Sequence, residues 1–302
     1  MKSVPLAPNT FHLQSGSNIG LVVHDGQALL IDTGLDGDAG RRALRILEER
    51  EAQLEAVIVT HAHADHFGGA HFLQRRLEVP LYAPGLEAAM MEHPIIEPLY
   101  LFAGAAPIEA LRDKFTLAQP CEVNRTVAPG PLRIGPFRVA IVPLPGHALN
   151  QVGVAVEDNG KRVLFCADAI FPEETIKKHK VLFCVDLDET LETIESLAAQ
   201  SYDHFAPGHG PAYTSGAAIE TICDANRDRL EEIRDATYEA LERPRETSAV
   251  VQHIAEAFAL KIKRPTAYFL TRTTVLAALS SLEKAGRAAA TTDANRLLWE
   301  RR

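Results

Sequence analysis

The sequence predicts an α/β protein with one large and one smaller domain. Short apolar runs, bounded by Gly, Pro or polar residues, alternate with amphipathic helical patterns up to about residue 210. Histidines and aspartates follow directly after several of these runs, where loops leave a sheet and sites are usually built. Beyond that point the pattern becomes mainly helical. A length of 302 residues suits two domains, and we expect them over residues 1–215 and 216–302.

The first sixty residues predict the order strand, strand, helix, strand. The segment IGLVVHDGQALLIDTG is typical of a hairpin that turns at Asp25-Gly26. In GDAGRRALRILEER, apolar residues recur on one stripe of a helix: Ala39, Ala43, Ile46 and Leu47. The short strand 57–59 then leads into Thr60.

Further strands are expected over residues 139–142, 152–156, 163–165 and 204–206. Between them, residues 85–120 form an insertion of mixed helix and loop, rich in Ala, Pro and apolar residues. Exposed apolar surface of this kind either covers a pocket or forms a subunit contact, as in a homodimer. Residues 171–190 are expected to line the same pocket.

The C-terminal part combines helices with a basic charge. Apolar residues at helical spacing predict two helices, the second ended by Gly286, and a small hairpin turns near Asp293. Helix, helix and hairpin together are typical of a winged helix. Residues 261–302 carry a net charge of about +6, within a chain of net charge −9. Such a segment is either a solvated face or a contact for nucleic acid.

Composition sets broad limits. Hydrophobic residues make up 46% and charged residues 24%, as in a globular protein with a sizeable core. No apolar run reaches the roughly 18 residues of a membrane span, and the first residues lack the apolar stretch of a signal peptide. We therefore expect a cytoplasmic protein without membrane contact. The cysteines lack metal-site spacing and are expected to be reduced core residues: Cys121, Cys166, Cys184 and Cys223.

The stretch THAHADHFGG, residues 60–69, contains four metal-ligand side chains within six positions. Imidazole and carboxylate suit zinc and related divalent ions. In an extended segment His61 and His63 project to the same side, whereas Asp65 and His66, at an expected helix start, point elsewhere. The segment therefore predicts a metal site with room for two ions. Small residues at 68–70 allow the helix to pack closely beneath it.

This motif and four others resemble the metallo-β-lactamase superfamily. The others are LIDTG (30–34), PLPGHA (143–148), FCADAIF (165–171) and APGHG (206–210), all in the family's order. The resemblance implies a four-layer αββα sandwich that binds two divalent metal ions, with zinc expected and iron or manganese as alternatives. It implies His61, His63 and His147 on the first ion, Asp65, His66 and His209 on the second, and Asp168 bridging both.

Two metal ions that share a water lower its pKa from 15.7 toward about 7, which provides a hydroxide nucleophile. Asp65 is the expected catalytic residue for moving the proton, with a role as ligand alone as the alternative. Asp32 is expected to support a ligand histidine from behind, or to form the turn before Thr33-Gly34. The run KKHK, 177–180, either contacts an anionic substrate or is a solvated face.

The chain is similar to the glyoxalase II and lactamase-β-2-like branches of the superfamily. That similarity implies hydrolysis of a small-molecule ester, thioester or lactone. A single-strand-specific ribonuclease is the first alternative, because the basic segment 261–302 suits phosphate contacts. A mononuclear iron persulfide dioxygenase is the second, although all positions for a second metal are filled.

Overall fold

Two mixed β-sheets form the centre of the fold in the computed structural model, which describes residues 1–302. The first sheet has seven strands in the order β1 to β7, antiparallel as far as β4 and parallel from β4 onward. The second has six in the order β13-β12-β11-β10-β9-β8, antiparallel apart from the pair β11 and β12. The strands of the sheets are β1 (Lys2–Ala7), β2 (Thr10–Gln14), β3 (Ile19–His24), β4 (Gln27–Ile31), β5 (Gln53–Ile58), β6 (Leu81–Pro84), β7 (Arg125–Val127), β8 (Gly130–Ile134), β9 (Phe137–Pro143), β10 (Val152–Asp158), β11 (Lys161–Ala167), β12 (His204–Pro207) and β13 (Tyr213–Thr214).

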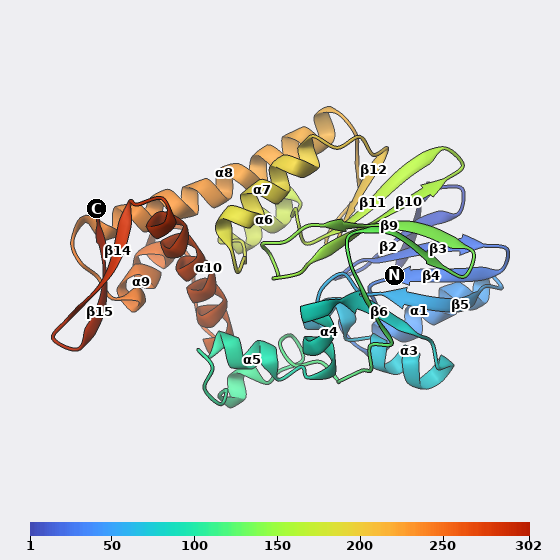
Figure 1. Ribbon diagram of the computed structural model, residues 1–302, viewed down its shortest axis with the longest axis horizontal. Helices are drawn as coiled ribbons and strands as arrows, with labels where there is room; N and C mark the ends of the chain where they lie inside the picture. The colour runs from blue at the N-terminus through green and yellow to red at the C-terminus, as the bar shows by residue number, and fades with distance from the viewer.

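Helices cover the outer face of each sheet, which confirms the αββα sandwich (Figure 1). One apolar cluster fills the space between the sheets, and includes Leu29 of β4 and Val154 of β10. A second joins the first sheet to α1 and α3, and a third joins the second sheet to α7 and α8. Each large apolar side chain buried in this way stabilises the fold by roughly 1.5–3 kcal/mol. The covering helices are α1 (Gly37–Glu49), α3 (Ala70–Leu77), α6 (Glu173–His179), α7 (Leu187–Ala198) and α8 (Ala217–Glu239).

Local chemistry explains the elements nearest to the histidine cluster. The predicted hairpin is confirmed, and Asp25 and Gly26 both have positive φ, as its tight turn requires. The predicted helix is α1, which begins after Asp36. The Asp36 side chain accepts hydrogen bonds from the backbone N–H groups of Asp38 and Ala39 and so caps the helix.

The order predicted for the first sixty residues is incomplete, because β1 and β2 precede the hairpin. The strand β1 contains Pro5, and its two exposed residues, Lys2 and Pro5, do not follow a clean alternation of apolar and polar side chains. The strands β6, β7, β8 and β13 were also missed. Three of these have no more than four residues, and pairing with a neighbouring strand stabilises them more than local propensity does.

The insertion between β6 and β7 is helical and irregular, as predicted. It contains α4 (Gly85–Glu92), α5 (Ile96–Leu101) and the 3₁₀ turn η1 (Glu109–Leu111). In Figure 1 it extends below the sheets toward the C-terminal helices. Phe102 packs edge-on against Phe269, and Thr266 Oγ1 donates a hydrogen bond to Ala110 O at 2.6 Å. The insertion thus joins the sandwich to the end of the chain.

The C-terminal region lies at one end of an elongated molecule (Figure 1). After α8 come η2 (Ala240–Glu242), α9 (Thr247–Ala257), α10 (Pro265–Lys284) and the hairpin β14 (Ala288–Asp293) and β15 (Arg296–Arg301). The predicted hairpin and the helix that stops at Gly286 are confirmed, whereas α9 was missed. The domain boundary at 215/216 and the winged-helix assignment stay predictions. None of the helices has the length and apolar character needed to cross a membrane.

Candidate metal centre

The loop after β5 carries His61 and His63, and a buried aspartate holds this loop. Asp32, directly after β4, accepts hydrogen bonds from the Thr60 backbone N–H at 2.8 Å and from Thr60 Oγ1 at 2.9 Å. The same carboxylate lies 2.8 Å from His66 Nδ1. Asp32 also has a positive φ of 64°. One residue therefore turns the chain and orients a histidine, which are the two roles that the sequence left open.

Asp65 and His66 lie on the short helix α2 (Ala64–Phe67). The expectation that both point away from the two preceding histidines is wrong for His66, because its ring centroid lies 4.1 Å from that of His61. His66 is completely buried. Asp65 is less enclosed, and its Oδ2 accepts a hydrogen bond from Ser17 Oγ at 2.8 Å. Ser17 is a contact that the sequence pattern did not indicate. The same oxygen, Oδ2, lies 3.4 Å from His209 Nε2, so Ser17 holds the oxygen that faces the cluster.

Glycines permit the close approach of these loops. A Cβ at Gly68 would lie 1.9 Å from Leu35 O, and one at Gly208 would lie 2.2 Å from Asp168 Oδ1. Real side chains do not tolerate such distances to neighbouring backbone or buried groups. The small residues after the histidine cluster thus allow α2 to pack directly on the loop that follows β4, as predicted.

The second sheet supplies the remaining side chains from the ends of three strands. His147 follows β9, Asp168 follows β11 and His209 follows β12. Asp168 Oδ2 lies 3.6 Å from His147 Nε2 and 3.3 Å from His209 Nε2, while its Oδ1 lies 3.3 Å from His66 Nε2. Asp168 is therefore the side chain that reaches members of both predicted ligand groups.

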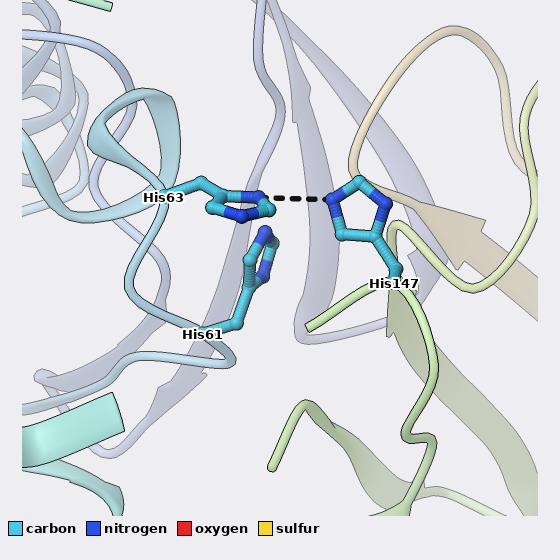
Figure 2. A group of neighbouring side chains, drawn as sticks. All are labelled: His61, His63 and His147. Carbon is cyan, nitrogen blue, oxygen red and sulfur yellow. Dashed lines mark hydrogen bonds between the residues drawn. The ribbon is translucent and has the colours of Figure 1, made fainter. Parts of the chain in front are cut away.

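All seven predicted ligands meet in one cluster. Their donor atoms form three groups in which every atom lies within 4.8 Å of the others: His61, His63 and His147; His61, His66 and Asp168; and Asp65, His66 and His209. Figure 2 shows the first group, with His63 Nδ1 and His147 Nε2 facing each other at 2.9 Å. Residues more than a hundred positions apart thus contribute to one cluster.

The nitrogen and oxygen atoms at the centre fit a metal. His61 Nε2, His66 Nε2 and Asp168 Oδ1 are buried and form no hydrogen bond. Leaving three such atoms unpaired costs about 1–3 kcal/mol each, and a bound cation would satisfy all of them. The outer nitrogens of the ligands are occupied, because His147 Nδ1 contacts Phe183 O at 3.0 Å and His209 Nδ1 contacts Gly16 O at 2.8 Å. This arrangement of a ligand histidine held from behind is typical of metal sites.

Electrostatics favour a cation in the same place. Burial lowers the pKa of His63 to about 3, so this imidazole is neutral and free to donate a lone pair. Burial would also lower the pKa of His209, but the carboxylates of Asp168 and Asp65 outweigh it and raise the value to about 10. The two aspartates therefore attract positive charge, which a proton or a metal ion can supply.

Glu87, on α4 of the insertion, connects two ligand loops and was not indicated by the sequence pattern. Its Oε2 accepts a hydrogen bond from the Ala62 N–H, and its Oε1 accepts one from the Asn150 N–H, both at 2.9 Å. The side chain is 1% exposed. One buried carboxylate thus fixes the loop of His61 and His63 relative to the loop of His147.

A second support, also missed, comes from α10. Thr274 Oγ1 donates to Leu182 O at 3.1 Å and lies 3.4 Å from the Cys184 N–H, so it holds the segment 182–184 from both sides. Phe183, between these two residues, provides the carbonyl that contacts His147. Helix α10 therefore supports the predicted ligand His147 indirectly, through the segment 182–184.

A pocket of about 660 Å³ opens from the cluster toward α10. Its inner end contains His63, Asp168 and other members of the cluster, and the insertion contributes Glu97 and Phe115. Residues from the segment 171–183 and from the segment 260–274 complete the wall. The predicted pocket-lining roles of the insertion and of the segment after Asp168 are thus confirmed. A subunit contact through the insertion stays a prediction.

Comparison with known proteins identifies the large N-terminal part of the chain. The family model described as Metallo-beta-lactamase superfamily matches residues 13–209. Over 152 residues the chain is 28% identical to a hydroxyacylglutathione hydrolase of Albidiferax ferrireducens. That match covers 50% of this chain and 46% of the relative, so it spans less than half the relative's length. A ribonuclease J of Mycoplasma pneumoniae is 31% identical over 85 residues, which cover 25% of this chain and 15% of that protein.

The fold of the whole chain has a counterpart among solved structures. A metallo-beta-lactamase family protein from Thermus thermophilus superimposes with a TM-score of 0.75 at 19% identity. The superposition covers 99% of this chain and 100% of the other. The C-terminal helices are therefore part of a shared architecture.

Proposed function

Because the chain belongs to the metallo-beta-lactamase superfamily, we propose that it is a metal-dependent hydrolase that cleaves a small-molecule ester, thioester or lactone. One observation carries this proposal: seven histidine and aspartate side chains converge in one cluster, and five of them line the inner end of a pocket. Relatives with the names of hydrolases support the class of reaction.

We propose that two divalent ions bind, with zinc as the first candidate. His61, His63 and His147 would hold one ion, Asp65, His66 and His209 would hold the other, and Asp168 would contact both. When bound, such ions acidify water and polarise a scissile carbonyl. The unpaired atoms of His61, His66 and Asp168 support this assignment, since each needs a partner.

The chain's own residues orient the reacting groups and move the proton. Asp65 is the proposed proton carrier, because its Oδ2 accepts a hydrogen bond from Ser17 Oγ and also lies 3.4 Å from His209 Nε2 at the cluster. If Asp65 is a metal ligand alone, solvent molecules would carry the proton instead. Asp32 fixes the orientation of His66, and Phe171 and Phe183 pack edge-on against His147, which limits access of bulk water.

The size of the pocket, and the internal contacts of several basic residues elsewhere in the C-terminal segment, favour a small substrate over a nucleic acid. A volume of about 660 Å³ lies within the usual range for small-molecule sites. Several charges of the basic segment 261–302 are neutralised or engaged within the chain: Lys284 pairs with Asp186, Arg296 pairs with Asp293, and Arg287 and Arg301 stack on Tyr238. Ribonuclease activity remains the alternative, supported by the short match to ribonuclease J.

We propose that residues 1–215 form the hydrolase domain and that residues 216–302 form a winged-helix-like domain whose main role is to complete the pocket. The wall residues from 260–274 support this role. A nucleic-acid contact through the same domain belongs with the ribonuclease alternative.

The experiment is a panel of thioesters and lactones, assayed beside labelled single-stranded RNA, with the metal content measured on the same preparation. His63→Ala is the blank, because it removes a ligand without changing the rest of the pocket wall. Two ions per chain and ester or thioester turnover that disappears in His63→Ala are expected. RNA cleavage without any ester turnover would contradict the proposal, and one iron with oxygen consumption would favour the dioxygenase.

A further inference from the structure

Three cations line the outer part of the pocket without an internal partner. Lys178 comes from α6, and Lys261 and Arg264 come from the loop between α9 and α10. All three are exposed, whereas the metal-centre residues at the inner end are mostly buried. None of the three forms an ion pair or a side-chain hydrogen bond within the chain, in contrast to Lys177, which pairs with Glu173.

The three lysines of the KKHK run therefore have different environments. Lys177 is exposed and bonded to a residue one helical turn away, and Lys180 Nζ donates to Ala259 O at 3.1 Å. Lys178 alone of the three lysines lines the pocket. The Lys180 bond also joins the end of α6 to the segment that leads to Lys261, which brings the cations from two distant parts of the sequence to one wall.

The pocket wall outside the metal centre carries an excess of positive charge. Outside the metal centre, the acidic residues that line the pocket are Glu97 and Asp113, against three cations. Burial, followed by the charge of Asp65, raises the pKa of the Glu97 carboxyl well above the ordinary value. Burial, followed by the charge of Lys178, lowers the pKa of His179.

We propose that Lys178, Lys261 and Arg264 form a subsite for an anionic group of the substrate, a carboxylate or a phosphate, remote from the bond that is cleaved. This inference rests on the proposed hydrolase function and adds the substrate class. Arginine and lysine together suit both anions, since the guanidinium offers a planar pair of donors and the ammonium a point charge. The cations stand at the exposed end of the pocket and the proposed ligands at the buried end. The anionic group of the substrate would therefore lie nearer the pocket mouth than the bond that is cleaved.

The test uses three matched thioesters with the metal-loaded full-length chain: S-acetyl-6-mercaptohexanoate, S-acetyl-6-mercaptohexyl phosphate and the uncharged S-acetyl-6-mercaptohexanamide. Their comparison separates carboxylate from phosphate recognition. The variants are Lys178→Gln, Lys261→Gln, Arg264→Gln and the triple variant. Lys177→Gln and Lys263→Gln are matched controls, because they remove cations from the same two segments that do not line the pocket.

We expect kcat/KM for at least one anionic thioester to exceed that for the amide by about tenfold, and each single variant to reduce this ratio about threefold to fivefold, mainly through KM. The triple variant should abolish the preference, rising salt should weaken it, and the two controls should retain it. Equal use of all three thioesters, or a preference that survives in the triple variant, would overturn the subsite while leaving the hydrolase proposal intact. Failure to hydrolyse any ester, thioester or lactone would instead contradict the proposed function itself.

Discussion

The two ends of the pocket are built in opposite ways. At the inner end, histidines and aspartates are buried, their outer atoms are hydrogen-bonded to fixed loops, and glycines bring backbone segments into direct contact. At the outer end, charged side chains are exposed and have no partner in the chain. The difference indicates that the geometry of the reacting groups is fixed before a substrate arrives, whereas recognition is left to side chains that are free to adapt.

Replacing Asp168 should have the largest effect, because its two oxygens face members of both ligand groups. We expect Asp168→Asn to lower kcat about 1,000-fold or more, as loss of a central electrostatic group does, and to reduce the metal content below two ions per chain. Metal analysis and hydrolysis of the uncharged thioester check this. Retention of two ions with full activity would show that the inner end does not depend on the Asp168 carboxylate.

Gly68→Ala tests the close packing of the inner end. The added Cβ would lie 1.9 Å from the backbone oxygen of Leu35, so we expect a loss of about 3 kcal/mol in the free energy of unfolding. Gly85→Ala is the matched control, since nothing lies within 4 Å of a Cβ there. Denaturant titration measures both. Equal stability of the two variants would mean that the loops separate easily.

His12 links the stability of the inner end to pH. It is buried beside the His209 loop, contacting Pro207 O at 3.1 Å, and burial lowers its pKa to about 4. In the unfolded chain the imidazole titrates near 6.5, so between pH 6.5 and 4 the unfolded state binds more protons than the folded state. The free energy of unfolding should therefore decrease as the pH is lowered from 6.5 to 4, by up to about 3 kcal/mol from this residue. His12→Gln, which retains a donor for Pro207, should remove that part of the slope in unfolding measurements at several pH values.

Glu87→Gln should have a smaller effect that is specific to the metal centre. A glutamine has only one acceptor oxygen, so one of the N–H groups of Ala62 and Asn150 would lose its partner. We expect metal affinity to fall about 10- to 100-fold, as for other residues that orient ligands. Glu92→Gln, on the same helix but bonded to Val123, is the control. Competition with a chelator gives the affinities, and unchanged values would exclude a positioning role.

The prediction from sequence was most successful where chemistry is local. The cluster from His61 to His66 and the strand-end positions of His147, Asp168 and His209 identified the side chains that the fold brings together. Helix α1 and both hairpins followed from periodicity and turn residues that act within a few positions.

What escaped prediction depends on contacts between distant segments. Ser17, Glu87 and Thr274 have no distinctive local pattern, and each acquires its role only when the chain folds against a ligand loop. The short strands β6 and β7 likewise exist because neighbours pair with them. The different environments of the KKHK lysines depend on which of them lines the pocket. Helical spacing alone does not determine this.

The bond between Thr274 and the segment 182–184 has a consequence for biosynthesis. Every proposed ligand precedes residue 210, but the helix that steadies the His147 loop, α10 (Pro265–Lys284), is translated after all of them. Translation proceeds at about 5–20 residues per second. For several seconds, a nascent chain therefore contains all seven proposed ligands but lacks the contact between Thr274 and the segment 182–184. We therefore expect the segment 182–184, and with it the His147 loop, to be held in place only after α10 has been translated and has docked.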